Sequence, residues 1–293
     1  MADYLDAYAA HHDLPVRSSV RATRLTKSGD EFLIATTVGD FTAPNVIIAT
    51  GSYADPKVPS FAADLDPHIV QLHSSAYRNP SQLQPGGVLL VGGGNSGADI
   101  SLEVVQTHPT WLAGPPVPHI PPDIDKWFAR TFVVRGVRFA QRNVLCLRTP
   151  VGRRAAPKMR GKATPLIRVK PKWLAEAGVQ RVGRVVGVHD GLPKLEDDQV
   201  LDVTNVIWCT GYRHDFPWID LDTAFDEHGA PVHARGVSTE VAGLYFIGLE
   251  FQFALASASL WGVARDAAYI VSHLHRHSAV KPADEAAVAR TAA

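Results

Sequence analysis

A glycine-rich turn is the segment of this sequence whose residue types and spacing could bind a charged cofactor. Gly92, Gly94 and Gly97 fit the pattern G-x-G-x-x-G within VLLVGGGNSGADIS. The first glycine of such a turn allows a tight bend, the second lets the backbone approach a pyrophosphate, and the third lets the next helix pack on the strand. The N–H groups and the dipole at the start of that helix favour phosphate charge. The spacing therefore predicts a dinucleotide site, with a glycine turn that holds no ligand as the alternative.

The end of the following strand should show which dinucleotide is bound. An acid there would bind the ribose hydroxyls of NAD, whereas an arginine would bind the 2′-phosphate of NADP. The segment WLAGPPVPH, residues 111–119, contains neither. The nearest cation candidate is His119, for which a surface position is the simpler interpretation. The sequence alone therefore leaves NADH and NADPH open.

No other cluster predicts catalysis or metal binding. The histidines of HLHRH, residues 273–277, alternate along an expected helix, so their rings should point in different directions and we expect no metal site. Cys209 lies in an apolar strand without a CxxC partner and is interpreted as a buried structural cysteine. Neither G-x-S-x-G nor HExxH occurs, and no catalytic side chain is assigned.

A basic segment runs from Lys126 to Lys172, with 14 lysines and arginines and no acidic residue. Nucleic acid or an anionic membrane is one class of partner for such a segment. Neither an aromatic stacking motif nor a long amphipathic helix accompanies it. We therefore favour a solvated basic face that helps to attract an anionic cofactor.

The composition is that of an ordinary globular protein and narrows the choice of partners. The chain has 293 residues, of which 46% are hydrophobic and 20% charged, and its formal net charge is +0, so we expect no nucleic-acid partner. Two cysteines fit a reducing cytoplasm. The first residues show no signal-peptide pattern, and no run of about 18 apolar residues occurs, so we expect a cytoplasmic protein without a membrane span.

The elements that must position the turn alternate between strands and helices. We expect a helix over 3–12, a β meander over 16–51 that ends in NVIIATG, and short strands over 179–211 that end in NVIWCTG. A strand at 243–248 and a helix over 254–276 follow. This alternation predicts an α/β fold with parallel sheets, and the repeated meander-then-strand pattern predicts two related dinucleotide-binding domains.

Five motifs in order resemble those of flavin-containing monooxygenases and Baeyer–Villiger monooxygenases, including a bacterial group of flavoprotein oxidoreductases. They are NVIIATGSYADPKVP, IVQLHSSAYRNP, VGGGNSGADIS, VIWCTGYRHDFPWI and GLYFIGLEFQFALASASLWGVARDAAYI. Each motif is weak by itself, but their order and spacing fit over about residues 1–275. The resemblance implies a FAD- and NAD(P)H-dependent oxidoreductase with two dinucleotide-binding domains in one chain.

The resemblance also implies roles for individual residues. His73 would be the linker histidine that couples domain movement to cofactor binding, with a hydrogen-bonded loop residue as the alternative. The residues that would hold the NAD(P)H pyrophosphate are Gly92, Gly94, Asn95, Ser96 and Gly97. The residues that would line the FAD side are Ala49, Thr50, Gly51, Gly248 and Leu249. The cofactor-binding set also includes Thr210 and Gly211, which with Tyr212 would return the chain to the FAD domain.

Two departures from the family pattern matter. The family arginine after the second strand appears as Pro115, which puts the preference for NADPH in doubt. The family's first strand and its own G-x-G-x-x-G turn do not precede NVIIATG, so the main anchor of FAD would be missing. We therefore expect an FAD domain that is incomplete at the N-terminus, formed by 1–84 and 206–275, an inserted NAD(P)H domain at 85–205, and a disordered tail at 276–293.

The resulting hypothesis is a flavin-dependent NAD(P)H oxidoreductase of the monooxygenase type, in a shortened chain. NAD(P)H would reduce FAD by hydride transfer, and the reduced flavin would use O2 to oxygenate a small-molecule substrate. One alternative is a non-catalytic NAD(P)H-binding remnant or one part of a split flavoprotein. A third is an interaction protein that uses residues 126–172. The sequence does not identify the substrate, and a homodimer is compatible with it.

Overall fold

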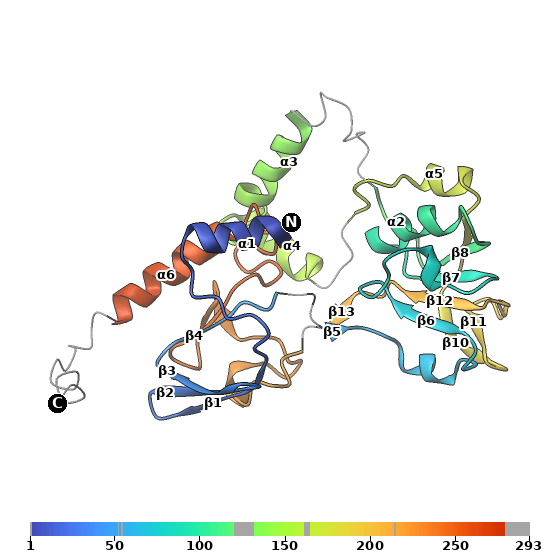
Figure 1. Ribbon diagram of the computed structural model, residues 1–293. Coiled ribbons are helices and arrows are strands. Elements are labelled where there is room, and N and C mark those ends of the chain that lie inside the picture. Colours follow the sequence, from blue (N-terminus) through green and yellow to red (C-terminus); the bar gives the residue numbers. More distant parts are fainter. Residues whose placement is uncertain are drawn as a thin grey trace. The chain divides into compact units, whose positions relative to one another are not determined.

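The computed structural model describes residues 2–51, 53, 55–119, 132–160, 165–213 and 215–278. Their contacts divide the chain into two compact units (Figure 1). The first unit comprises the segments 1–48, 215–246 and 270–293, and the second comprises 49–214 and 247–269. Each unit is therefore built from segments that are distant in the sequence.

The second unit is built on a five-stranded parallel sheet with the order β6-β12-β7-β8-β9. Its strands are β6 (Val70–His73), β7 (Val88–Val91), β8 (Thr110–Ala113), β9 (Gln180–Val182) and β12 (Asn205–Trp208). Every residue of β7 and β12 is buried. Their near-continuous apolar runs are typical of parallel strands that are covered on both faces.

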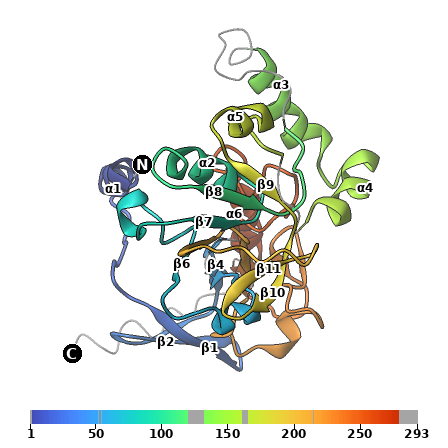
Figure 2. The same ribbon diagram turned by 90° about the vertical axis from the view of Figure 1, so that its right-hand side faces the viewer.

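Alternate residues of these strands point to opposite faces and build two cores. The covering elements are α2 (Asn95–Val104), α5 (Pro171–Glu176), β10 (Val185–His189) and β11 (Leu192–Leu195). Leu90 and Ile207 belong to the core under the helices, and Leu89 and Trp208 belong to the core under the β10–β11 hairpin. Figure 1 and Figure 2 show the two helices and the hairpin on opposite faces of the sheet. The turn after β7 therefore leaves a sheet that is packed on both sides.

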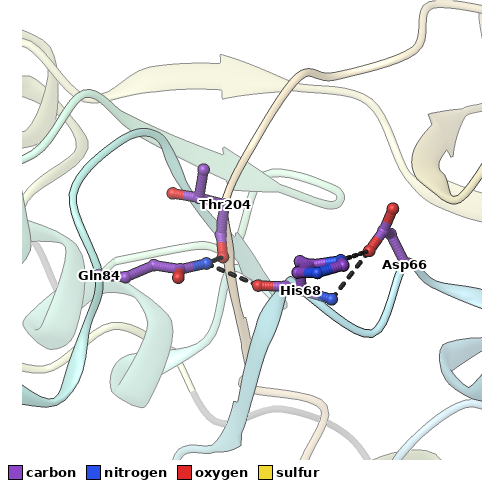
Figure 3. Close-up of polar contacts among 4 residues, drawn as sticks. All are labelled: Asp66, His68, Gln84 and Thr204. Carbon is purple, nitrogen blue, oxygen red and sulfur yellow. Dashed lines mark hydrogen bonds and ion pairs between the residues drawn. The ribbon is translucent and has the colours of Figure 1, made fainter.

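A polar cluster joins the amino ends of β6, β7 and β12. The side-chain amide of Gln84 donates to the carbonyl oxygens of His68 and Thr204, each at 2.7 Å (Figure 3). The fully buried Asn205 accepts from the N–H of Gln84 and donates to its carbonyl oxygen, each at 2.9 Å. The backbone N–H and then the ring of His68 donate to Asp66, which lowers the pKa of that carboxyl. These bonds hold the strands at the edge opposite the glycine turn.

The first unit contains a three-stranded antiparallel meander and a four-stranded sheet. The meander consists of β1 (Ala22–Ser28), β2 (Glu31–Thr36) and β3 (Gly39–Ala43). The second sheet has the order β14-β15-β16-β4, from β14 (His233–Ala234), β15 (Val237–Ser238), β16 (Leu244–Phe246) and β4 (Val46–Ile48). Its strands β16 and β4 are parallel. Leu25 and Phe32 are fully buried in this unit, as the alternation of the predicted meander requires.

Shorter elements and the remaining helices complete the two units. The short elements are β5 (Asp55–Pro56), β13 (Tyr212–Arg213) and the 3-10 turns η1 (Ser60–Asp64), η2 (Pro80–Gln82) and η5 (Asp222–Ala224). The helices are α1 (Ala2–His11), α3 (Val134–Phe139), the π-helical η4 (Ala140–Val144), α4 (Pro150–Met159) and α6 (Ala264–Ser278). None of the described helices is both long and apolar enough to cross a membrane.

The expected helix over 254–276 begins too early, because α6 starts only at Ala264. Phe253, just before the expected start, is bonded in another way. Its carbonyl oxygen accepts from the N–H of Leu147 at 2.8 Å, and its N–H donates to the hydroxyl of Ser257 at 3.1 Å. The bond to Leu147 is tertiary and the bond to Ser257 is a local side-chain bond, and both hold the backbone in a non-helical arrangement at this point.

The α/β class with a parallel sheet and β meanders is confirmed. The domain boundaries at 84/85 and 205/206 stay predictions, and β6 and β12 lie in the same sheet as β7. Of the predicted tail, residues 276–278 end α6, and the remainder lies outside the described residues. Parts of the basic segment, 126–131 and 161–164, lie outside them as well.

Candidate functional site

The glycine turn leaves the sheet at the carboxyl end of β7. Gly92 has a φ of +119°, a conformation that favours glycine. Its N–H donates to the carbonyl oxygen of Ala113, at the end of β8, at 3.0 Å. A Cβ on Gly92 would lie 2.2 Å from the carbonyl oxygen of Cys209, which follows β12. A side chain at this position would therefore collide with the backbone of the neighbouring strand.

Gly97 lies in the first turn of α2 and is crowded in the same way. A Cβ on Gly97 would lie 1.9 Å from the carbonyl oxygen of Gly92. The buried hydroxyl of Ser101 donates to the carbonyl oxygen of Gly97 at 2.6 Å, one turn further along the helix. The helix thus packs directly on the turn, which is the close approach that the third glycine of such a motif permits.

Gly94 has the opposite environment. It is the N-cap of α2 in extended conformation, and its carbonyl oxygen accepts the N–H of Ala98 at 3.0 Å. A Cβ on Gly94 would meet no atom of the described residues within 4 Å. The first N–H groups of a helix have no acceptor within the helix, and the helix dipole favours an anion there. This open cradle therefore fits a phosphate group of a dinucleotide.

Asn95 and Ser96 follow at the start of α2. The side chain of Asn95 donates to the carbonyl oxygen of Pro165 at 3.1 Å and accepts from the N–H of Ile167 at 2.9 Å. These bonds tie the start of the helix to the segment before α5. Ser96 is exposed. That both residues bind a pyrophosphate stays a prediction, in which their backbone N–H groups would make the contact.

The turn lies where the connections from the sheet diverge. β8 and β9 lie on one side of β7, and β12 and β6 lie on the other. Ligands of open α/β sheets bind outside the carboxyl ends of the strands at such a point. Thr210 and Gly211 follow β12 at this same edge. The hydroxyl of Thr210 donates to the carbonyl oxygen of Lys57, and the N–H of Lys57 donates to the carbonyl oxygen of Gly211 at 2.9 Å.

His73 is the last residue of β6 and is only 8% exposed. Its Nδ1 accepts from the N–H of Ser75 at 3.2 Å, and its Nε2 lies 3.0 Å from the carbonyl oxygen of Gly211. Because Nδ1 is an acceptor, the neutral ring carries its proton on Nε2 and donates to Gly211. The ring also meets the Tyr212 ring edge-on, with the centroids 5.0 Å apart. His73 therefore joins the ends of β6 and β12, while its role as a linker that senses the cofactor stays a prediction.

A short ladder lies beside His73. β5 pairs antiparallel with β13, with Tyr212 opposite Pro56. The rings of Tyr53 and Tyr212 meet edge-on with their centroids 5.3 Å apart. Burial, and then the charge of Glu250, raises the pKa of Tyr53. Along the chain, β5 comes shortly after the boundary between the units at 48/49, and β13 comes just before the boundary at 214/215.

The predicted flavin-side residues lie in two neighbouring loops of the second unit. Ala49, Thr50 and Gly51 follow β4, and Gly248 and Leu249 come shortly after β16. Gly51 and Gly248 have φ angles of +68° and +82°. Within the described residues, a Cβ on Gly51 would meet nothing within 4 Å, and one on Gly248 would meet the Cα of Gly51 at 3.9 Å. The two loops thus leave open space against bare backbone, which fits the close approach of a flavin nucleotide.

Sequence reasoning missed the partners of these residues. The N–H of Lys57 donates to the carbonyl oxygen of Gly211, and the N–H of Ser75 donates to Nδ1 of His73. Arg181, on β9, donates to the carbonyl oxygen of Gly114 at 2.8 Å, directly after β8. No local motif marks these three residues. The order of the strands is the signal that could have found Arg181, because it places β9 beside β8.

The structure adds detail on Cys209 and the histidine-rich helix end. Cys209 is partly and not fully buried, but desolvation raises the pKa of its thiol to about 12, which keeps it protonated and fits a structural role. Among the described residues, no three His, Cys, Asp or Glu side chains form a group that could hold a metal. The rings of His273 and His277 stack with centroids 3.9 Å apart. The expectation that the three rings point in different directions is therefore wrong for His273 and His277, which lie four positions apart on α6 and so share one face of the helix.

Comparisons with known proteins identify the family. Residues 1–110 match the family model for pyridine nucleotide-disulphide oxidoreductases. The chain is 33% identical over 278 residues to an uncharacterized CzcO-like oxidoreductase of Geobacillus kaustophilus, which covers 94% of this chain and 78% of that protein. It is 34% identical over 278 residues to the uncharacterized oxidoreductase CzcO of Bacillus subtilis, covering 93% of this chain and 77% of that protein.

A solved structure has the same fold. The flavin-containing monooxygenase from Stenotrophomonas maltophilia aligns with a TM-score of 0.70 and 22% identity, over 94% of this chain and 76% of that chain. At this identity the likeness concerns the fold alone, whereas the identity to the CzcO relatives extends over most of both chains. The chain belongs to the family of CzcO-like oxidoreductases.

Proposed function

We propose that this protein is a flavin-dependent NAD(P)H oxidoreductase of the monooxygenase type. NAD(P)H would bind at the turn after β7, and FAD would bind beside Gly51 and Gly248. The open cradle at Gly94 is the observation that carries the proposal. Gly92 and Gly97 are crowded by backbone atoms, whereas Gly94 faces free space. This division among the three glycines is the one that a dinucleotide pyrophosphate requires.

The side chains and backbone of this protein would bind and orient the cofactors. When bound, FAD and NAD(P)H supply the hydride transfer and the reaction with O2. N–H groups at the start of α2 would hold the pyrophosphate, and the bare backbone at Gly51 and Gly248 would let the flavin nucleotide approach. His73 would fix the position of the Gly211 carbonyl at the same sheet edge. This chemistry requires no side-chain nucleophile.

The proposal includes a small-molecule substrate, O2 and a cytoplasmic location. A non-catalytic remnant and an interaction protein that uses residues 126–172 are not favoured, because the relatives that define the family are oxidoreductases. Whether the protein forms a homodimer stays a separate prediction.

The test is the visible absorption spectrum of the purified chain with and without added FAD, and then with NADPH in the absence of oxygen. We expect protein-bound flavin whose visible band bleaches when NADPH is added. If no flavin is retained even with excess FAD, the oxidoreductase proposal is wrong for this chain. Retained NADPH binding without flavin would instead support the remnant.

Two glycine variants make the test specific to the turn. Gly94→Val fills the cradle and should abolish bleaching by NADPH while bound FAD is retained. Gly187→Val, on β10, is the matched control, because a Cβ on Gly187 also meets nothing within 4 Å among the described residues. We expect it to behave as the unchanged protein does. Equal loss in both variants would show that the effect is not one of the cradle.

A further inference from the structure

A cavity opens beside the glycine turn at the carboxyl ends of β8 and β9. Its volume is about 460 Å³, and it is lined by residues 114–116, by residues 181–184 and by Glu196, Asp197 and Gln199, which follow β11. A Cβ on Gly114 would lie 3.6 Å from the backbone nitrogen of Gly93, in the middle of the turn. The cavity therefore adjoins the glycine turn, and its size is usual for small-molecule sites.

Arg181 connects the cavity to the turn. A Cβ on Gly93 would lie 3.1 Å from Nη1 of Arg181 and 3.1 Å from the carbonyl oxygen of Pro115. The guanidinium thus lies over Gly93, and its Nη2 donates to the carbonyl oxygen of Gly114 at 2.8 Å. Although β9 supplies this residue, its charged end lies at the end of β8, where a dinucleotide fold places the group that recognises the adenosine ribose.

No acidic side chain among the described residues forms an ion pair with the positively charged Arg181. Partial burial of the guanidinium lowers the pKa of Arg181. Its hydrogen-bond acceptor within the described residues is the neutral carbonyl of Gly114, and no carboxylate of those residues forms an ion pair with it. A guanidinium has five N–H donors in a planar fork that suits a phosphate group. The site therefore has donors to offer to an added anion.

The cavity wall also contains two carboxylates, which would favour the ribose hydroxyls of NADH over a phosphate. Glu196 accepts from the backbone N–H of Arg184 at 3.1 Å, and Asp197 accepts from the backbone N–H of Gln199 at 3.3 Å. Both acids thus accept from backbone N–H groups of the segments that flank the β10–β11 hairpin. Arg181, by contrast, contacts the glycine turn itself. A carboxylate that bound the ribose hydroxyls would favour NADH.

We propose that this cavity receives the 2′-phosphorylated ribose of NADPH and that Arg181 is the residue that selects NADPH over NADH. The inference rests on the proposed function, since it needs the dinucleotide to bind at the turn. It assigns to β9 the cation that the sequence lacks after β8, where Pro115 stands. Arg181 would take no part in the chemical step, because it would touch the cofactor far from the transferred hydride.

The experiment measures the dissociation constants of NADPH and NADH for the full chain by calorimetry, at one fixed salt concentration. We expect NADPH to bind at least about tenfold more tightly than NADH, the effect of one or two charge-assisted hydrogen bonds. In Arg181→Ala the NADPH affinity should fall about tenfold while that of NADH changes by less than about twofold. Arg181→Lys keeps the positive charge but lacks the planar guanidinium, so its affinity for NADPH should lie between those of the unchanged protein and Arg181→Ala.

Arg21→Ala is the control variant. It removes an exposed arginine of the first unit that does not line the cavity, and it should leave both constants unchanged. Urea unfolding of each variant excludes a loss of fold as the cause of an effect.

The outcomes separate the inference from the proposal on which it rests. If the unchanged protein binds both nucleotides equally, or NADH more tightly, only the inference is overturned. Equal weakening of both nucleotides by Arg181→Ala would also overturn it, because that is the effect of a merely structural residue. If neither nucleotide binds, the proposed function is wrong and the inference is wrong with it.

Discussion

The carbonyl oxygen of Gly92 occupies the place that a side chain on Gly97 would need, since a Cβ there would lie 1.9 Å from it. The strand end and the helix start are therefore in direct backbone contact. The position and direction of α2, and with them the cradle at Gly94, depend on this contact.

Gly97→Ala should lower the free energy of unfolding by about 1–3 kcal/mol, the usual cost of overpacking, because the crowding atom belongs to the backbone and cannot turn away. Replacement of a helical glycine by alanine otherwise stabilises by about 0.5–1 kcal/mol. Gly136→Ala in α3 is the matched control, since a Cβ on Gly136 meets nothing within 4 Å among the described residues. Urea unfolding should give the two variants opposite signs, and the same sign would contradict the crowding argument.

Asn205→Ala should cost about 2–3 kcal/mol of stability, because it leaves buried donors and acceptors of the strand junction without partners. Asn205 is fully buried and bonds both the N–H and the carbonyl of Gln84. Gln84→Ala should cost less, since Gln84 is only half-buried and water can reach the carbonyls that it leaves. Urea unfolding of both variants checks the order, and a larger loss for Gln84→Ala would show that the junction is organised differently.

His73→Phe keeps a ring beside Tyr212 but removes the donor to the Gly211 carbonyl. We expect a loss of about 1–2 kcal/mol in the free energy of unfolding, the range for a lost hydrogen bond in a buried place. Ser75→Ala removes the hydroxyl that lies 2.9 Å from His73 Nδ1 but keeps the backbone N–H that donates to the same atom, and it should cost less than His73→Phe. An unchanged stability in His73→Phe would mean that the contact with Gly211 contributes nothing to folding.

The raised pKa of Cys209 predicts a loss of stability in alkali. Burial raises the pKa of this thiol from 9.0, the value of an exposed thiol, to about 12, so above pH 9.0 the folded state holds a proton that the unfolded state releases. The contribution is fully present below pH 9.0 and falls as the pH rises towards 12. Thermal unfolding at about pH 8 and about pH 11 should therefore show a steeper loss for the unchanged protein than for Cys209→Ala. Parallel losses would remove Cys209 as a cause.

Local sequence predicted the turn well because steric rules act over a few residues. The spacing of Gly92, Gly94 and Gly97 is enough to predict a strand, a bend and a helix, and each glycine has an environment that suits its expected part. The long apolar segment after Ala254 was harder. Its composition favours a helix, but Phe253 and its neighbours bond to a distant segment instead, and such contacts leave no local trace.

The missing cation shows the same limit at the level of the site. The segment directly after β8 contains no arginine, and no local motif marks a more distant residue that could take its place. Arg181 comes from β9, which lies far from β8 in the sequence but pairs with it in the sheet. Only the strand order reveals that Arg181 and Gly93 are neighbours.

The ladder between β5 and β13 has a consequence for folding. Both strands belong to the second unit, and the Lys57 N–H and the Gly211 carbonyl are bonded directly beside them. Because these partners are distant in the sequence, their pairing closes a long loop of the chain, and the entropy cost of that closure must be met before the ladder can form.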